Sequence, residues 1–203
     1  IGSKSTPQQY GAPVRHYILH NKGNGQFEDA TDVVLPRAAT IGFVNAASWV
    51  NLLGDNRPEL VVAGEWMAPR IFMFKGNVLE EVATKMPNMN GWWQSMATAD
   101  VDGDGDLDVI SSGSNKFAWY ENTNGQGDLS VEHLIPLSNN SSRVLNTADL
   151  DGDGDQDILF INRTPNKIGW FENTDGAGTF GTEIILATVT KPLSILAVDL
   201  DGD

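Results

Sequence analysis

Two stretches of this 203-residue chain carry the same acidic pattern, Ala99-Asp-Val-Asp-Gly-Asp-Gly-Asp-Leu-Asp-Val109 and Ala148-Asp-Leu-Asp-Gly-Asp-Gly-Asp-Gln-Asp-Ile158. The pattern begins again at Val198-Asp-Leu-Asp-Gly-Asp203, and a degenerate copy lies at Val50-Asn-Leu-Leu-Gly-Asp-Asn-Arg-Pro-Glu-Leu60. The first loop positions are residues 51, 100, 149 and 199, so successive copies lie 49, 49 and 50 residues apart. Self-similarity at a nearly constant spacing indicates a protein built from copies of one structural unit.

A second pattern keeps nearly the same step, because Trp119-Tyr-Glu-Asn-Thr123 and Trp170-Phe-Glu-Asn-Thr174 lie 51 residues apart. A period of about 50 residues is the length of one four-stranded β-propeller blade. Each period divides into four short apolar segments separated by turn residues, and the expected strands include about Arg70–Lys75, Gln94–Ala99 and Asp157–Ile161. No stretch of ten or more residues keeps the apolar spacing of a helix. The sequence therefore predicts an all-β propeller of antiparallel, four-stranded blades.

The repeat also predicts where each blade begins and ends. We expect a partial blade with its last two strands at 1–40, a blade with the degenerate loop at 41–90, blades with complete loops at 91–139 and 140–189, and the start of a further blade at 190–203. Propellers close with roughly four to eight blades, and an open arc exposes strand edges. We therefore expect a fragment of a longer propeller, in which the remaining blades pack against these.

The excess negative charge is concentrated in the acidic copies. The net charge is −14, and 13 of the 27 acidic residues lie in three copies, while the other 14 nearly balance the 13 Lys and Arg. Nucleic acid is excluded as the expected partner because phosphate binding needs a basic surface. The absence of Cys excludes disulfides and thiolate metal sites. No apolar run approaches the roughly 20 residues of a membrane helix, so membrane insertion is not expected.

Each complete loop reads Asp-x-Asp-Gly-Asp-Gly-Asp-x-Asp, and carboxylates this close together repel one another unless a cation lies among them. Ca²⁺ takes about six to eight oxygen ligands in a flexible shell, and glycine at the sixth position permits the sharp turn. Zinc would need His or Cys, and Mg²⁺ keeps its waters, so Ca²⁺ fits best; a solvated acidic turn is the alternative. The predicted ligands are Asp100, Asp102, Asp104, Asp106 and Asp108 in one loop, and Asp149, Asp151, Asp153, Asp155 and Asp157 in the other.

Two further copies depart from the complete pattern. The last copy contributes Asp199, Asp201 and Asp203 as candidate calcium ligands, but without positions six to nine we expect it not to bind tightly. In the degenerate copy Leu53 replaces the third-position carboxylate and Pro58 stiffens the end. We therefore predict weak or no calcium binding there.

These residues resemble the FG-GAP/VCBS repeat family, whose calcium-loop blades also form the head of integrin α chains, and the resemblance spans about residues 17–203. It implies the ligands named above, with Asp106 and Asp155 binding through the main chain. Gly64-Glu-Trp-Met67 and Gly91-Trp-Trp93 are also similar to the repeats that precede ASPIC/UnbV domains in secreted bacterial proteins. The resemblance implies a non-catalytic bacterial protein, secreted or on the cell surface, that serves adhesion or binds a protein or glycan.

Two alternatives to a calcium-rigidified binding scaffold stay open. The chain could be the accessory propeller of a larger carbohydrate-active hydrolase or lyase, or it could itself be a lectin-like, carbohydrate-binding propeller. Outside the acidic loops the sequence shows no convergent acid, base and nucleophile, so we expect no enzyme activity in these blades. Candidate ligand-surface residues are the tryptophans that do not recur with the repeat, Trp66, Trp92 and Trp93, whereas Trp119 and Trp170 recur and are expected in the core.

Overall fold

The computed structural model describes residues 14–37, 41–83, 85, 91–113, 116–137, 142–162, 164 and 166–199, with the side chains of 142–144 left aside. Its elements are β1 (Leu19–Gly23), β2 (Gln26–Asp29), α1 (Thr31–Val34), β3 (Phe43–Val50), β4 (Glu59–Met67), β5 (Arg70–Lys75), β6 (Val78–Glu81), β7 (Gly91–Ala99), β8 (Asp108–Gly113), β9 (Lys116–Glu121), β10 (Val131–Leu134), β11 (Ser142–Ala148), β12 (Asp157–Asn162), β13 (Lys167–Phe171) and β14 (Ile184–Thr188). The predicted all-β class is confirmed, since the described residues form strands and one four-residue helix.

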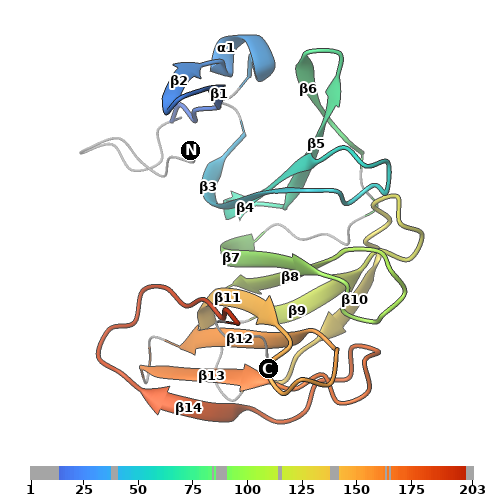
Figure 1. Ribbon diagram of the computed structural model, residues 1–203, viewed down its shortest axis with the longest axis vertical. Helices are drawn as coiled ribbons and strands as arrows, with labels where there is room; N and C mark the ends of the chain where they lie inside the picture. The colour runs from blue at the N-terminus through green and yellow to red at the C-terminus, as the bar shows by residue number, and fades with distance from the viewer. Residues whose placement is uncertain are drawn as a thin grey trace.

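The strands form three antiparallel, four-stranded units, β3–β6, β7–β10 and β11–β14, which follow one another along the long axis (Figure 1). The first strands of the units, β3, β7 and β11, are neighbours in space. This is the arrangement of propeller blades, whose first strands lie side by side around a common axis. The structure therefore confirms the predicted fold as an open arc of blades.

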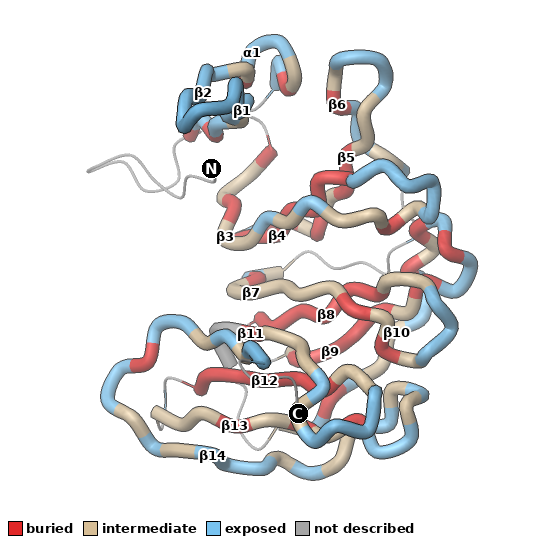
Figure 2. The backbone as a smooth tube through the Cα atoms, in the orientation of Figure 1, coloured by how far each residue is buried: buried red, intermediate tan, exposed pale blue. Residues whose placement is uncertain are grey.

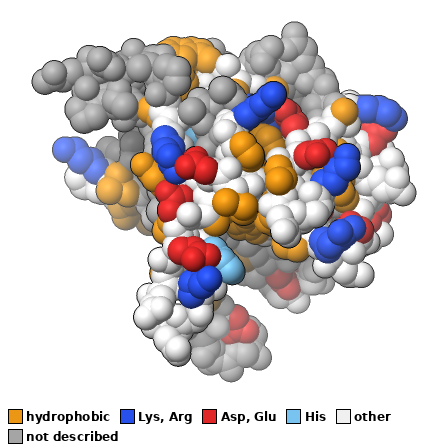
Figure 3. All heavy atoms as spheres, turned by 90° about the horizontal axis from the view of Figure 1, so that it is seen from above, with side chains coloured by type: hydrophobic (Ala, Val, Ile, Leu, Met, Phe, Trp, Pro, Cys, Tyr) orange, Lys and Arg blue, Asp and Glu red, His pale blue; other side chains and the backbone are white. Residues whose placement is uncertain are grey.

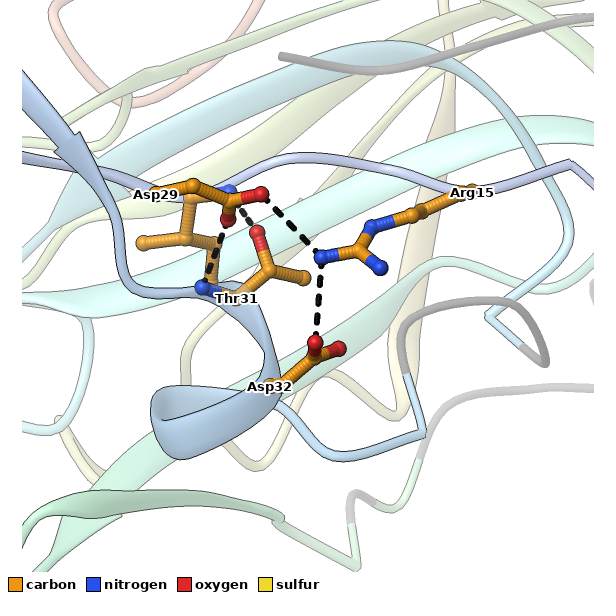
Figure 4. A network of polar contacts seen from close by, with 5 residues as sticks. Arg15, Asp29, Thr31 and Asp32 are labelled. Atoms are coloured by element: carbon orange, nitrogen blue, oxygen red, sulfur yellow. Dashed lines mark hydrogen bonds and ion pairs between the residues drawn. The ribbon is translucent and has the colours of Figure 1, made fainter.

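The hairpin β1–β2 stands apart from these units and is followed by helix α1, which the sequence did not predict. Arg15 Nη2 donates to Asp29 Oδ2 at 3.1 Å and to Asp32 Oδ2 at 3.3 Å (Figure 4). The amide of Thr31 donates to Asp29 Oδ1 at 3.0 Å. These bonds hold the start of the helix against the end of β2. The sequence did not predict the helix because four residues are too few to show apolar periodicity.

Strand pairing also joins the first two units. Near its end, β4 pairs with the start of β7, with Glu65 opposite Trp92 and Met67 opposite Gly91. The sequence predicted that the first strand of this unit begins at Gln94, whereas β7 begins at Gly91. Of the added residues, Gly91 and Trp92 pair with β4 of the preceding unit, whereas Trp93 pairs with Gly113 of β8 in its own unit.

The core lies between successive blades (Figure 2). Val61 and Ile71 of the β3–β6 unit pack in one cluster with Val109 and Tyr120 of the β7–β10 unit. A second cluster joins Ile110 and Trp119 of the β7–β10 unit to the β11–β14 unit. The side chains from the β11–β14 unit are Ile158, Phe160 and Phe171. Strand β8 is buried throughout because a neighbouring blade covers each of its faces, and β12 is likewise buried along its whole length.

The recurring tryptophans differ in burial. Trp119 is 2% exposed and lies in the core as predicted, beneath Gly178 in the turn of the following blade. Trp170 is only half-buried. The turn of the following blade covers Trp119, which accounts for its nearly complete burial.

Candidate metal centres

Each acidic loop joins the first strand of a blade to the second. Residues 100–107 connect β7 to β8, and residues 149–156 connect β11 to β12. The degenerate copy connects β3 to β4 in the same place. Three successive loops thus occupy equivalent positions at one end of three stacked blades.

The first aspartate of each complete loop organises the turn. Asp100 Oδ1 accepts a hydrogen bond from the amide of Gly103 at 2.9 Å, and its Oδ2 accepts one from the amide of Gly105 at 3.1 Å. Asp149 makes the matching bonds to Gly152 at 2.8 Å and to Gly154 at 3.0 Å. The loop backbone therefore curls around this carboxylate. At the sixth position Gly105 has φ +93°, a conformation that residues with a Cβ rarely adopt.

The ninth aspartate of each loop is buried, and its carboxylate is held by two backbone amides. Asp108 is 1% exposed and accepts from Val101 at 2.9 Å and from Asn122 at 2.8 Å. Burial raises the pKa of Asp108 to about 7 and also raises the pKa of Asp157. Burial therefore disfavours the negative charge on both carboxylates, and a bound cation would offset that cost.

The carboxylates converge in both complete loops. Oxygen atoms of Asp100, Asp102 and Asp108 lie within 4.8 Å of one another in the first loop. In the second loop the converging set is Asp149, Asp151 and Asp153. All of these donors are carboxylate oxygens, the type that Ca²⁺ and Mg²⁺ prefer. Both clusters could bind a metal ion.

The remaining predicted ligands are placed differently. Asp104 of the first loop and Asp157 of the second lie outside these sets. The carboxylates of Asp106 and Asp155, at the seventh position, lie against Gly125 and Gly176 in the turn that follows the third strand of the same blade. Binding through the main chain at this position stays a prediction. In the last copy Asp199 is exposed, and Asp201 and Asp203 lie outside the described residues.

The degenerate loop is closed by its own side chains. Glu59 is 1% exposed, and its Oε2 accepts from the amides of Leu52 at 2.9 Å and Leu53 at 3.1 Å, the role that Asp108 has in the complete loop. The guanidinium of Arg57 donates to Asp55 Oδ2 from Nε at 3.2 Å and from Nη2 at 3.0 Å. A positive side chain thus lies on the fifth-position carboxylate that would face an ion in a complete loop.

Sequence reasoning missed two buried asparagines beside the loops, Asn122 and Asn173. The backbone N–H of Asn122 donates to Asp108, and its Nδ2 donates to the carbonyl of Leu52 in the preceding blade at 2.9 Å. The signal that could have found them is the pattern Trp-x-Glu-Asn-Thr, in which the asparagine recurs as regularly as the tryptophan.

A separate aromatic surface lies where β4 ends and β7 begins. The rings of Trp66 and Trp92 are 5.5 Å apart at an interplanar angle of 73°, and Phe43 lies 5.7 Å from Trp66 on its other side. Trp66 is 57% exposed and Trp92 38%. Trp93, which was also a candidate surface residue, is 3% exposed and packs in the core, so that prediction was wrong. Its side chain faces the opposite side of β7 from that of Trp92.

Other parts of the surface mix both charges. The end face seen in Figure 3 carries Lys and Arg side chains interspersed with Asp and Glu and with hydrophobic side chains. Among the described residues, no helix has the length and apolar character needed to cross a membrane.

Comparison with known families identifies the repeat. A model of the FG-GAP-like repeat matches residues 51–111, 100–160 and 149–203. The chain belongs to the FG-GAP-like repeat family. Each of the first two matches begins at the first position of one loop and runs through the next, so the match spans the degenerate loop and both complete ones.

Solved structures agree with the fold. A lectin of Agrocybe aegerita, described as specifically recognising non-reducing terminal N-acetylglucosamine, superposes with a TM-score of 0.58 at 21% sequence identity. The match covers 85% of this chain and 46% of the lectin, so the chain spans about half of the lectin's length. No curated protein sequence matches significantly. The likeness to the lectin shows a shared fold.

Proposed function

We propose that this chain is a calcium-binding, non-catalytic β-propeller module of a secreted or cell-surface protein that presents a binding surface for a protein or glycan. The observation that carries the proposal is the convergence of three carboxylates in each complete loop, and in the first loop this set includes Asp108, whose negative charge is disfavoured by burial. FG-GAP-like membership supports it, because the matched repeats include these loops.

Calcium would act structurally in this proposal. Asp100 directly follows β7, and Asp108 is the first residue of β8. An ion bound by both carboxylates would therefore join the first two strands of the blade at one rim. When bound, the ion supplies positive charge that offsets carboxylate repulsion and burial. Extracellular calcium modules bind with a Kd of about 10⁻⁴–10⁻³ M, which suits a secreted protein.

Thermal melting tests this proposal. With free calcium about tenfold above Kd, each site should stabilise the folded chain by about 1.4 kcal/mol, which raises Tm by roughly 3–6 °C per site for a chain of this size. Magnesium at the same concentration should give a smaller rise, and EDTA should reverse the effect. Equal Tm values in calcium and in EDTA would contradict the proposal.

A second candidate function, glycan binding, is favoured by the aromatic surface of Trp66, Trp92 and Phe43. Trp66 has φ +54°, a left-handed conformation that costs a bulky residue about 1–3 kcal/mol and that often marks functional positions. Exposed indole rings offer flat apolar faces with a polar N–H edge, which suits the mixed apolar and hydroxyl surface of a sugar ring. The fold shared with a lectin adds support.

A glycan array tests this candidate with glycans that end in N-acetylglucosamine and in other sugars. We expect binding by the unaltered chain and at least a tenfold loss in the Trp66→Ala and Trp92→Ala variants. Trp49→Ala is the matched control, because Trp49 is also exposed but stacks on Phe74 elsewhere on the blade. Equal losses in all three variants, or no binding to any glycan, would overturn this candidate.

A further inference from the structure

The two buried asparagines make the same set of contacts in successive blades. Asn122 follows β9 and Asn173 follows β13, and their exposed fractions are 0% and 1%. In each, the backbone N–H donates to the ninth-position aspartate of its own blade, Asp108 or Asp157. In each, Oδ1 accepts from a glycine of the adjoining turn.

The amide nitrogen of each asparagine reaches the blade before it. Asn173 Nδ2 donates to the carbonyl of Val101 at 2.8 Å, and Asn122 Nδ2 donates to the carbonyl of Leu52 at 2.9 Å. Val101 and Leu52 both hold the second position of their loops. Each asparagine therefore bonds to two loops in neighbouring blades.

The contacts join three loops in one continuous chain of buried hydrogen bonds, which we name the loop belt. Its links run in order from Asp157 to Asn173 (2.9 Å), Asn173 to Val101 (2.8 Å), Val101 to Asp108 (2.9 Å), Asp108 to Asn122 (2.8 Å), Asn122 to Leu52 (2.9 Å) and Leu52 to Glu59 (2.9 Å). All seven residues are at most 1% exposed. Water therefore does not compete for these bonds.

Backbone packing reinforces the loop belt. A Cβ built on Gly103, at the fourth position of the first complete loop, would lie 3.2 Å from the carbonyl oxygen of Gly176 in the turn of the next blade. The same relation holds between Gly54 and the carbonyl oxygen of Gly125, at 3.1 Å. The degenerate loop and the first complete loop therefore each rest directly on the turn that the following asparagine organises.

We propose that Asn122 and Asn173 are positioning residues that couple neighbouring loops, so that calcium bound in loop 149–157 strengthens calcium binding in loop 100–108, and the reverse. The proposal rests on the calcium binding proposed above. If an ion were bound in the second loop, Asp157 would be ordered and, through Asn173, so would the carbonyl of Val101. The backbone N–H of the same residue donates to Asp108, so the first loop would then lose less conformational freedom when it binds its own ion.

The degenerate loop forms a fixed end of the loop belt. Glu59 and the Asp55–Arg57 pair close that loop with its own side chains. Asn122 thus links the first complete loop to a loop already ordered, whereas Asn173 links two loops that both fill with calcium. Loss of Asn122 should weaken loop 100–108 directly, with only a secondary effect on loop 149–157, and loss of Asn173 should weaken both.

A site-resolved NMR titration with calcium tests the coupling. The amide signals of Gly105 and Gly154 report the two loops, because each amide donates to the first aspartate of its own loop. In the double variant Asp149→Asn/Asp151→Asn, which changes only the second loop, we expect the Kd at Gly105 to rise about fivefold or more. In Asn173→Ala we expect a similar rise at Gly105, although no ligand of that loop is altered.

Asn124→Ala is the control, since the side chain of Asn124 accepts hydrogen bonds from the amides of Gln126 and Asp128 in its own turn. It should leave both Kd values unchanged. If Asn173→Ala does not fold, the double variant still decides. An unchanged Kd at Gly105 in the double variant overturns the coupling and leaves calcium binding standing. No response at either glycine in the unaltered chain overturns both the coupling and the proposed function.

Discussion

Two kinds of ninth residue, aspartate and glutamate, close the three loops in the same way. Asp108 and Glu59 are both buried, and each accepts the amide of the second loop residue. They differ in what faces them, because carboxylates converge beside Asp108 whereas Arg57 pairs with Asp55 in the degenerate loop. Calcium dependence should therefore differ between the loops, because the degenerate loop has Leu53 at the third position and carries its own cation, Arg57, at the seventh.

A matched pair of substitutions at the fifth position follows. Asp153→Asn should weaken calcium binding at its loop by about tenfold or more, because it removes a charge from the converging carboxylates. Asp55→Asn should leave the number of bound calcium ions and their Kd unchanged. Calorimetric titration of both variants measures this, and a lost or weakened site in Asp55→Asn would show that the degenerate loop binds calcium after all.

The carboxylates of the site could be predicted from the sequence, whereas the repeat pattern could mark Asn122 and Asn173 as recurring residues without showing which loops they connect. Aspartates at alternate positions indicate a cation site in the sequence, because carboxylates so close together repel one another unless a cation lies among them. Asn122 and Asn173 follow strands at ordinary turn positions, and their role depends on Leu52 and Val101, which lie 70 and 72 residues earlier in the chain. Such contacts depend on how the blades stack, and the sequence pattern within one repeat does not specify the stacking.

At the scale of elements, the turn after the third strand fastens one blade to the blade before it. A Cβ on Gly178 would lie 2.3 Å from the ring of Trp119, and the residue has φ +78°. Gly76 in the β5–β6 turn has φ +64° with no atom within 4 Å of its Cβ position. Substitutions at the two glycines therefore distinguish two costs in the free energy of unfolding. One is the cost of a Cβ on a left-handed backbone, and the other is the cost of a clash between blades.

Alanine at these two positions should therefore act unequally. Gly76→Ala should lower the free energy of unfolding by about 1–2 kcal/mol, the cost of a left-handed backbone. Gly178→Ala should lower it by roughly a further 1–3 kcal/mol, because the added methyl group displaces Trp119. Urea denaturation measures both variants, and equal losses would show that the turn does not need this close approach.

The strands themselves were largely predictable. The expected strand Arg70–Lys75 is β5, and Asp157–Ile161 falls one residue short of β12. The sequence failed where a neighbouring blade decides the outcome, as in the early start of β7 at Gly91, which pairs with Met67 of β4. The sequence pattern within one repeat thus predicts the strands of a blade, and contacts with the neighbouring blade change where those strands begin and end.

At the scale of the whole molecule, stability and the proposed binding surfaces depend on stacking. Core side chains come from two successive units in two of the three buried clusters, so a blade contributes to the core through its neighbours. The candidate calcium loops lie at the β7–β8 and β11–β12 connections, while Trp66 lies near the other end of β4. Calcium would thus stabilise one rim while a ligand could be bound at the opposite one.

The most direct test of the central claim is a calcium titration of the unaltered chain by calorimetry. The account predicts two bound calcium ions per chain, with Kd values of about 10⁻⁴–10⁻³ M. Replacing both Asp100 and Asp149 with Asn should abolish the binding heat. The absence of binding heat from the unaltered chain, together with an unchanged Tm, would show that the two acidic loops are solvated turns and would contradict the proposed function.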